Sequence, residues 1–129
     1  MKTFMTTLAA CALSATAALA DPAEGRWSTQ PDDNGNTGIV TITMCGNTLC
    51  GTLTETRRGN GEVFQSDSTG RQIVWDMEPR GSGQYRSGHI WSPDRDQTYR
   101  ASMDLGGDRL TVSGCFLIIC RDQTWTRVN

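Results

Sequence analysis

Apolar and polar residues alternate with a period of two along most of the chain, which is the pattern of β-strands that bury one face. The clearest alternation runs from Ile39 to Thr56, where aliphatic positions alternate with threonines. Turns rich in Gly, Asn, Asp and Ser separate this stretch from the later ones, and no helical periodicity of any length is present. The pattern predicts a first strand at Gly25–Trp27, two strands within 39–56, one each at 71–79, 84–92 and 99–105, and two within 110–128.

Eight short strands with turns between them indicate an antiparallel, up-and-down meander of the all-β class. Closure into a small β-barrel hides the edge strands better than an open sheet does at this length, and a two-layer β-sandwich is the alternative. Within the barrel, Ile73, Trp75 and Met77 are predicted to share one face. The facing of 84–92 stays open. Its two alternating sets are Tyr85, His89 and Trp91, and Arg86, Gly88 and Ile90.

Residues 1–20 have the features of a secretory signal peptide: one lysine, a stretch rich in alanine and leucine, and a small-x-small cleavage site at Ala18-Leu19-Ala20. We therefore expect a cleaved leader and a single exported domain over residues 21–129, which is enough chain for one core. A lipoprotein box that ends at Cys11 is the less favoured alternative. No later segment approaches the roughly 20 apolar residues of a membrane-spanning helix, so no transmembrane segment is expected.

Charge and chemistry exclude several classes of function. Residues 21–129 carry eleven arginines and fourteen acidic residues, a net charge of −3, with no basic tract to hold nucleic acid or an anionic membrane surface. The single histidine, His89, rules out a site with several histidine ligands, and we interpret it as a packed barrel residue. Asp32–Asn36 resembles the start of a calcium loop but lacks the later glycine and glutamate. We expect no enzyme activity, metal or cofactor, because the carboxylates fall mostly in solvated turns: Asp32, Asp33, Asp94, Asp96 and Asp108.

Four cysteines follow the leader as two copies of Cys-x4-Cys. An even count in an exported domain predicts disulfides, in preference to a zinc site made of the same four thiolates. In the first copy, placing Cys45 opposite Cys50 across a four-residue tip pairs Thr43 with Thr52, so that like meets like. The register therefore predicts a disulfide that closes this hairpin.

The second copy gives the same result. Placing Cys115 opposite Cys120 pairs Leu110 with Trp125, and most other pairs also match in polarity. This final hairpin has an unusual tip, because four bulky apolar residues occupy positions where Gly, Asn or Asp is normal. Counting turns from the closed end of the barrel puts this tip at the open end. Its residues are Phe116, Leu117, Ile118 and Ile119.

Short motifs distributed along the chain resemble known families. Gly25-x-Trp27 with Arg127 resembles the signature of lipocalins and other calycins, in which the arginine packs across the tryptophan at the barrel's closed end. A longer series of motifs resembles the exported bacterial family called domain of unknown function 2147. They are Asp21-Pro22-x-x-Gly25-x-Trp27, Met44-Cys45-Gly46, Leu49-Cys50-Gly51, Gly88–Pro93 with Thr98-Tyr99, Leu110-x-Val112-x-Gly114-Cys115 and Gln123–Val128.

This resemblance implies a lipocalin-like barrel in the envelope of a Gram-negative bacterium, with the periplasm as the expected compartment and secretion as the alternative. It implies no established activity. The chain is shorter than a lipocalin and ends two residues after Arg127, which argues against a flanking helix and a large internal cavity. The first functional hypothesis is a barrel that binds a small apolar or amphipathic ligand between Trp75, Tyr85, Trp91 and Met103. The alternative is an envelope module with a packed barrel, which engages a partner through its surface or tip.

The apolar tip is the best candidate site, together with Trp91. Three arrangements are open for it. The tip could fold inward as a plug, rim a ligand entrance, or stand out as an apolar patch that docks a partner or the membrane interface.

Overall fold

The structure is a computed structural model that describes residues 3, 9 and 20–128. Nearly all of the predicted leader, Cys11 included, therefore lies outside the described residues. The described domain consists of strands β1 (Gly25–Ser28), β2 (Thr37–Cys45), β3 (Thr48–Arg57), β4 (Val63–Phe64), β5 (Gln72–Gly81), β6 (Gln84–Ser92), β7 (Gln97–Gly106), β8 (Arg109–Phe116) and β9 (Ile119–Val128).

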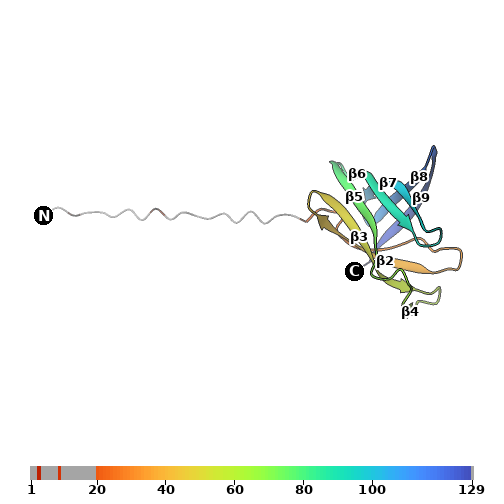
Figure 1. Cartoon of the computed structure of the whole chain (residues 1–129). Coiled ribbons are helices and arrows are strands. Elements are labelled where there is room, and N and C mark those ends of the chain that lie inside the picture. Colours follow the sequence, from red (N-terminus) through yellow and green to blue (C-terminus); the bar gives the residue numbers. More distant parts are fainter. Residues whose placement is uncertain (1–2, 4–8, 10–19, 129) are drawn as a thin grey trace.

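Eight of these strands close into an antiparallel barrel (Figure 1). The order around the ring is β2-β1-β9-β8-β7-β6-β5-β3, and pairing of β2 with β3 closes it. The two-residue β4 pairs with β3 outside the ring. The described residues contain no helix, and hence none that could cross a membrane. The predicted up-and-down barrel is confirmed, and the β-sandwich alternative is wrong.

The strand directions show which segments lie at each end of the barrel. Strand β1 runs antiparallel to β9, with Arg26 opposite Val128 and Ser28 opposite Thr126. The chain before β1 and the end of β9 therefore share one end, here called the closed end. The tip 116–119 and the β6–β7 turn lie at the other, open end, as the turn count predicted. Figure 1 shows the β8–β9 hairpin projecting beyond its neighbours.

Side chains fill the barrel over most of its length. The alternation predicted from the sequence directs aliphatic and aromatic residues of every ring strand into one core cluster. Burial of this apolar surface is the main source of stability, at about 25 cal/mol per Å². The largest fully buried side chains are Trp27, Trp125, Ile39, Ile42, Leu49, Met77, Met103, Leu110, Val40 and Val74.

The β2–β3 hairpin corrects the predicted register. Thr43 lies opposite Cys50 instead of Thr52, because the turn has two residues, Gly46-Asn47, in place of the four expected. Gly46 has φ 74°, a conformation that glycine adopts without strain and that two-residue hairpin turns favour. A shift of two residues keeps the facing of Val40–Cys45 as predicted, whereas a bulge between Ile39 and Val40 breaks the alternation so that both are buried. Cys45 and Cys50 therefore lie diagonally across the pair, and the predicted disulfide between them is confirmed, with Cα atoms 5.8 Å apart.

The β8–β9 hairpin has the predicted register throughout. Cys115 lies opposite Cys120, and Leu110 lies opposite Trp125. The second predicted disulfide is also confirmed, and its Cα atoms are 4.0 Å apart.

Strands β5 and β6 overturn the predicted facing of Trp75. Asp76 has φ 58°, and Ser87 on the neighbouring strand has φ 63°. At these two adjacent positions the regular in–out alternation of side chains is interrupted in both strands, so residues after them point to the opposite face from the one expected. As a result Met77 is buried in the core, whereas Trp75 lies on the outer face and stacks on His89. The expectation that Ile73, Trp75 and Met77 share one face was therefore wrong.

Candidate functional site

The closed end is held by Arg127 and Trp27. The Arg127 Cζ atom lies 4.3 Å from the centroid of the Trp27 ring. The two Nη atoms of Arg127 donate hydrogen bonds to the carbonyl oxygens of Glu24, at 3.0 Å, and Pro22, at 2.7 Å. Gly25 has φ 134°, and a Cβ atom there would meet the Arg127 guanidinium at 2.9 Å. This arrangement anchors the entering chain across the closed end of the barrel.

Tyr85 forms a second anchor for the entering chain. The buried Tyr85 hydroxyl donates a hydrogen bond to Asp21 Oδ1 at 2.6 Å. Burial, and then the hydrogen bond and charge of Asp21, raise the pKa of Tyr85 well above its usual range. The phenol is therefore a structural donor at neutral pH and is a poor candidate for proton transfer.

The Tyr85 anchor should give the protein an alkaline stability limit. The folded state holds this proton to higher pH than the unfolded state, so its stabilisation is complete below about pH 10 and falls as the pH rises further. The fall should reach about 1.4 kcal/mol per pH unit. Tyr85→Phe should lose about 1 kcal/mol at neutral pH and show a weaker alkaline fall in urea unfolding. Tyr99→Phe, which removes the other tyrosine hydroxyl, is the control and should keep the parent's alkaline profile.

The residues predicted to line a ligand cavity do not surround a common space. Tyr85 and Met103 are opposite one another and buried in the core. Trp75 lies on the outer face. Trp91 is buried under Arg71, whose Cζ atom is 3.3 Å from the ring centroid, and its Nε1 atom donates to Asp96 Oδ1 at 2.9 Å.

The apolar tip stands in solvent. The exposed fractions of its residues are 52% for Phe116, 74% for Leu117, 97% for Ile118 and 64% for Ile119. The plug arrangement is therefore wrong. Among the other large apolar residues of the described chain, only Val63 is as exposed as Phe116, at 52%. Such a run on a monomer usually marks a surface for a partner or a membrane.

The tip is held in one conformation by three contacts. The disulfide closes the hairpin one residue pair below Phe116. Arg100 Nη2 donates a hydrogen bond to the Leu117 carbonyl oxygen at 3.0 Å, and the Phe116 ring packs edge-on against Tyr99 with centroids 6.3 Å apart. Leu117 has φ 55°, which is unfavourable for a branched side chain. The apolar tip is thus both rigid and strained, as functional turns often are.

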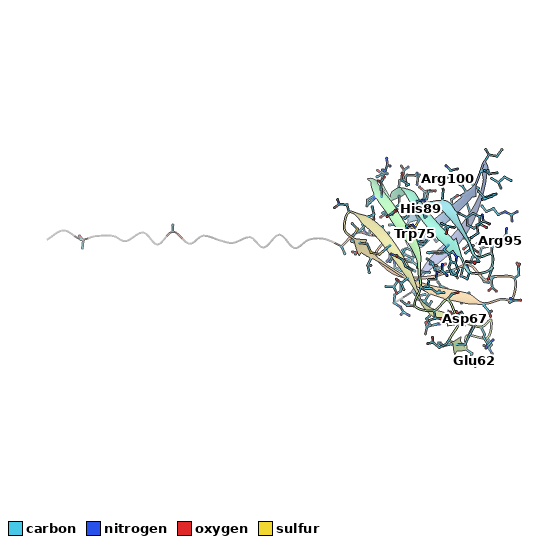
Figure 2. All side chains as sticks on the ribbon, viewed as in Figure 1. Glu62, Asp67, Trp75, His89, Arg95 and Arg100 are labelled. Carbon is cyan, nitrogen blue, oxygen red and sulfur yellow. A yellow bond between two sulfur atoms is a disulfide. The ribbon has the colours of Figure 1, made fainter. Side chains whose placement is uncertain are left out.

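A hollow on the outer face, which the sequence did not reveal, lies beside this hairpin. The strand registers place Trp75, His89, Arg100 and Cys115 side by side in one row across β5, β6, β7 and β8. Figure 2 shows Trp75, His89 and Arg100 along this row. The hollow has a volume of about 530 Å³, and its walls include His89, Arg100 and the Cys115–Cys120 disulfide. No sequence signal indicates this row, because it depends on the facing change at Asp76 and Ser87.

Among the described residues, no group of three His, Cys, Asp or Glu side chains is placed to hold a metal ion. His89 Nδ1 lies 3.9 Å from Asp76 Oδ2, beyond hydrogen-bond distance, and it is buried without a hydrogen-bond partner.

Comparisons with known proteins agree with this architecture. A protein from Helicobacter pylori of known structure, described as "Protein HP1028 from the human pathogen Helicobacter pylori belongs to the lipocalin family", superimposes with a TM-score of 0.67 at 14% identity. The match covers 82% of each chain and establishes a lipocalin-like fold. No curated protein matches the sequence. The profile of a family described as "Uncharacterized protein conserved in bacteria (DUF2147)" matches residues 25–127. The chain belongs to this DUF2147 family.

Proposed function

We propose that this protein is a non-catalytic, exported barrel that docks on the lipid–water interface of a bacterial envelope through its apolar tip. The observation that carries the proposal is the exposure of four consecutive apolar residues, Phe116–Ile119, on a rigid projecting hairpin. The two disulfides support an oxidising compartment, for which the periplasm is the natural choice.

The filled interior supports placing function on the outside of the barrel. A lipocalin-like fold is compatible with a small internal ligand, but the residues predicted for that role lie on different sides of the sheet. Trp27, Met77 and Met103 are fully buried against other side chains. A ligand of the usual size needs a cavity of about 300 Å³ or more. These side chains occupy the barrel interior, where such a ligand would bind.

A lipid interface suits the shape and chemistry of the tip. The tip is convex and narrow, so it can enter a soft interface without a matching pocket. Arg100 and Arg121 lie close behind it on β7 and β9, where guanidinium groups can meet headgroup phosphates. The net charge of −3 over residues 21–129 opposes attraction to anionic lipid. Apolar insertion, rather than surface charge, would therefore hold the barrel in place.

The test is the double substitution Leu117→Ser and Ile118→Ser, assayed by co-sedimentation with phosphatidylcholine vesicles. Each serine removes an exposed aliphatic side chain, so the partition coefficient should fall at least about ten-fold, which equals 1.4 kcal/mol. The melting temperature should stay near that of the parent, because neither side chain is buried. Binding of the parent should persist at high salt.

The matched control is Met44→Ser with Val63→Ser. These are the other exposed large apolar residues of the described chain, and they lie away from the tip on β2 and β4. The control should bind vesicles as the parent does. If the tip variant also did so, or if the parent failed to sediment with vesicles, the proposal would be wrong. Loss of melting temperature without loss of binding would assign the tip to the core.

A further inference from the structure

The hollow beside the tip has an uneven distribution of charge. Two arginines lie in its wall, Arg86 and Arg100. The Arg86 guanidinium is already occupied, since it donates to two backbone carbonyl oxygens and forms an ion pair with Asp104 at 3.0 Å. Arg100 has no carboxylate within ion-pair distance among the described residues, and one Nη atom alone is engaged, by Leu117. Arg100 is therefore the unneutralised cation of the hollow.

Polar donors surround Arg100 on the same face. His89 lies opposite Arg100 across the β6–β7 pair and lines the hollow, while its Nδ1 atom is buried and faces Asp76. Ser87 and Ser102 add hydroxyl groups to the wall. Asp76 is the carboxylate nearest His89, at 3.9 Å, and is largely exposed to solvent. An anion placed between Arg100 and His89 would gain a charge-assisted hydrogen bond and would meet little competition from the protein's own carboxylates.

The rest of the hollow is apolar. Gly88 and Ala101 face the core and contribute only backbone to its floor, and the Cys115–Cys120 disulfide forms one side. The indole of Trp75 continues the row, stacked on His89 with ring centroids 5.8 Å apart. A volume of about 530 Å³ is in the range of sites for small molecules.

From this geometry we infer that the outer hollow is a binding site for a small anionic amphiphile. Its carboxylate, sulfonate or phosphate group lies between Arg100 and His89, and its apolar body lies over Ala101 and the disulfide. The site shares Arg100 with the support of the apolar tip, but the tip's side chains lie outside it and it does not require the barrel to dock on a membrane. Its position at the base of the tip places the two surfaces side by side.

The test uses two fluorescent probes of similar size. Anilinonaphthalene sulfonate carries an anionic group, and N-phenyl-1-naphthylamine lacks one. The anionic probe should bind the parent protein and the Leu117→Ser/Ile118→Ser variant with equal affinity, because the tip is outside the hollow. Arg100→Gln should weaken the anionic probe about ten-fold or more and change the affinity of the neutral probe by less than about two-fold. Arg95→Gln, in the exposed β6–β7 turn and outside the hollow (Figure 2), is the charge control and should change neither.

A blocking variant separates the hollow from a general effect of charge. Ser102→Phe keeps every charge and places a phenyl ring in the wall of the hollow, two residues from Arg100 on β7, so it should abolish binding of the anionic probe while melting near the parent temperature. The inference is overturned if Arg100→Gln and Arg95→Gln have equal effects, if Ser102→Phe binds as the parent does, or if the tip variant alone removes binding.

Discussion

Replacing Trp27 with alanine should lower the free energy of unfolding by about 3 to 5 kcal/mol, the range for a large buried aromatic. The Trp27 ring is fully buried, its Nε1 atom donates to the Ala23 carbonyl oxygen at 2.9 Å, and Arg127 covers its face. Truncation therefore leaves a cavity, an unpaired carbonyl group and a guanidinium without its ring. Urea unfolding followed by far-UV circular dichroism measures the loss.

Trp75→Ala is the matched control, because that indole is only half-buried on the outer face, where it stacks on His89 and packs against the edge of the core cluster. Its loss should stay below about 1.5 kcal/mol, as for an aromatic pair at a surface. If Trp27→Ala unfolded at the parent's urea concentration and instead lost binding of a ligand, Trp27 would be a site residue and the assignment to barrel closure would fail.

Met77→Ala should destabilise the barrel by about 2 to 5 kcal/mol. Met77 is fully buried, and its side chain fills the space that a Cβ atom at Gly88 would need. The expected loss of stability is large because the backbone conformation at Asp76 directs the Met77 side chain into the core. Calorimetric melting of the purified variant measures it.

Gly88→Ala completes a double-mutant cycle with Met77→Ala. Alone, Gly88→Ala overfills the core and should cost about 1 to 3 kcal/mol. In the Met77→Ala background the added methyl group enters the vacated space, so the two losses should be less than additive. Additive losses would mean that Met77 and Gly88 are not in contact, and the description of β5 and β6 would need revision.

The sequence predicted the fold well because barrel strands carry their facing in the alternation of side chains. Both disulfides were predicted from the cysteine spacing, and the β8–β9 pairing from Cys115 and Cys120 together with matched pairs such as Leu110 and Trp125. The β2–β3 register was missed by two residues, although Gly46-Asn47 is a recognisable two-residue turn. A shift of two preserves every facing, so polarity matching could not detect the error.

The facing of Trp75 could not be read from the sequence. Asp76 and Ser87 adopt positive φ within continuous strands, where neither residue type signals a break. The outer hollow depends on this change and on three strand registers together, so it required the structure. The tip was singled out by composition, and its exposure could be decided only by the packing around it.

Fluorine NMR of the phenylalanines is the most direct test of the docking surface. A protein that begins at Asp21 contains two phenylalanines, Phe64 on β4 and Phe116 on the tip. Their rings can be fluorinated and observed in phosphocholine micelles that carry a nitroxide-labelled fatty acid, before and after reduction of the nitroxide. Our account predicts strong paramagnetic broadening of the Phe116 signal and little broadening of the Phe64 signal. Equal broadening of the two signals, or stronger broadening of Phe64, would contradict it.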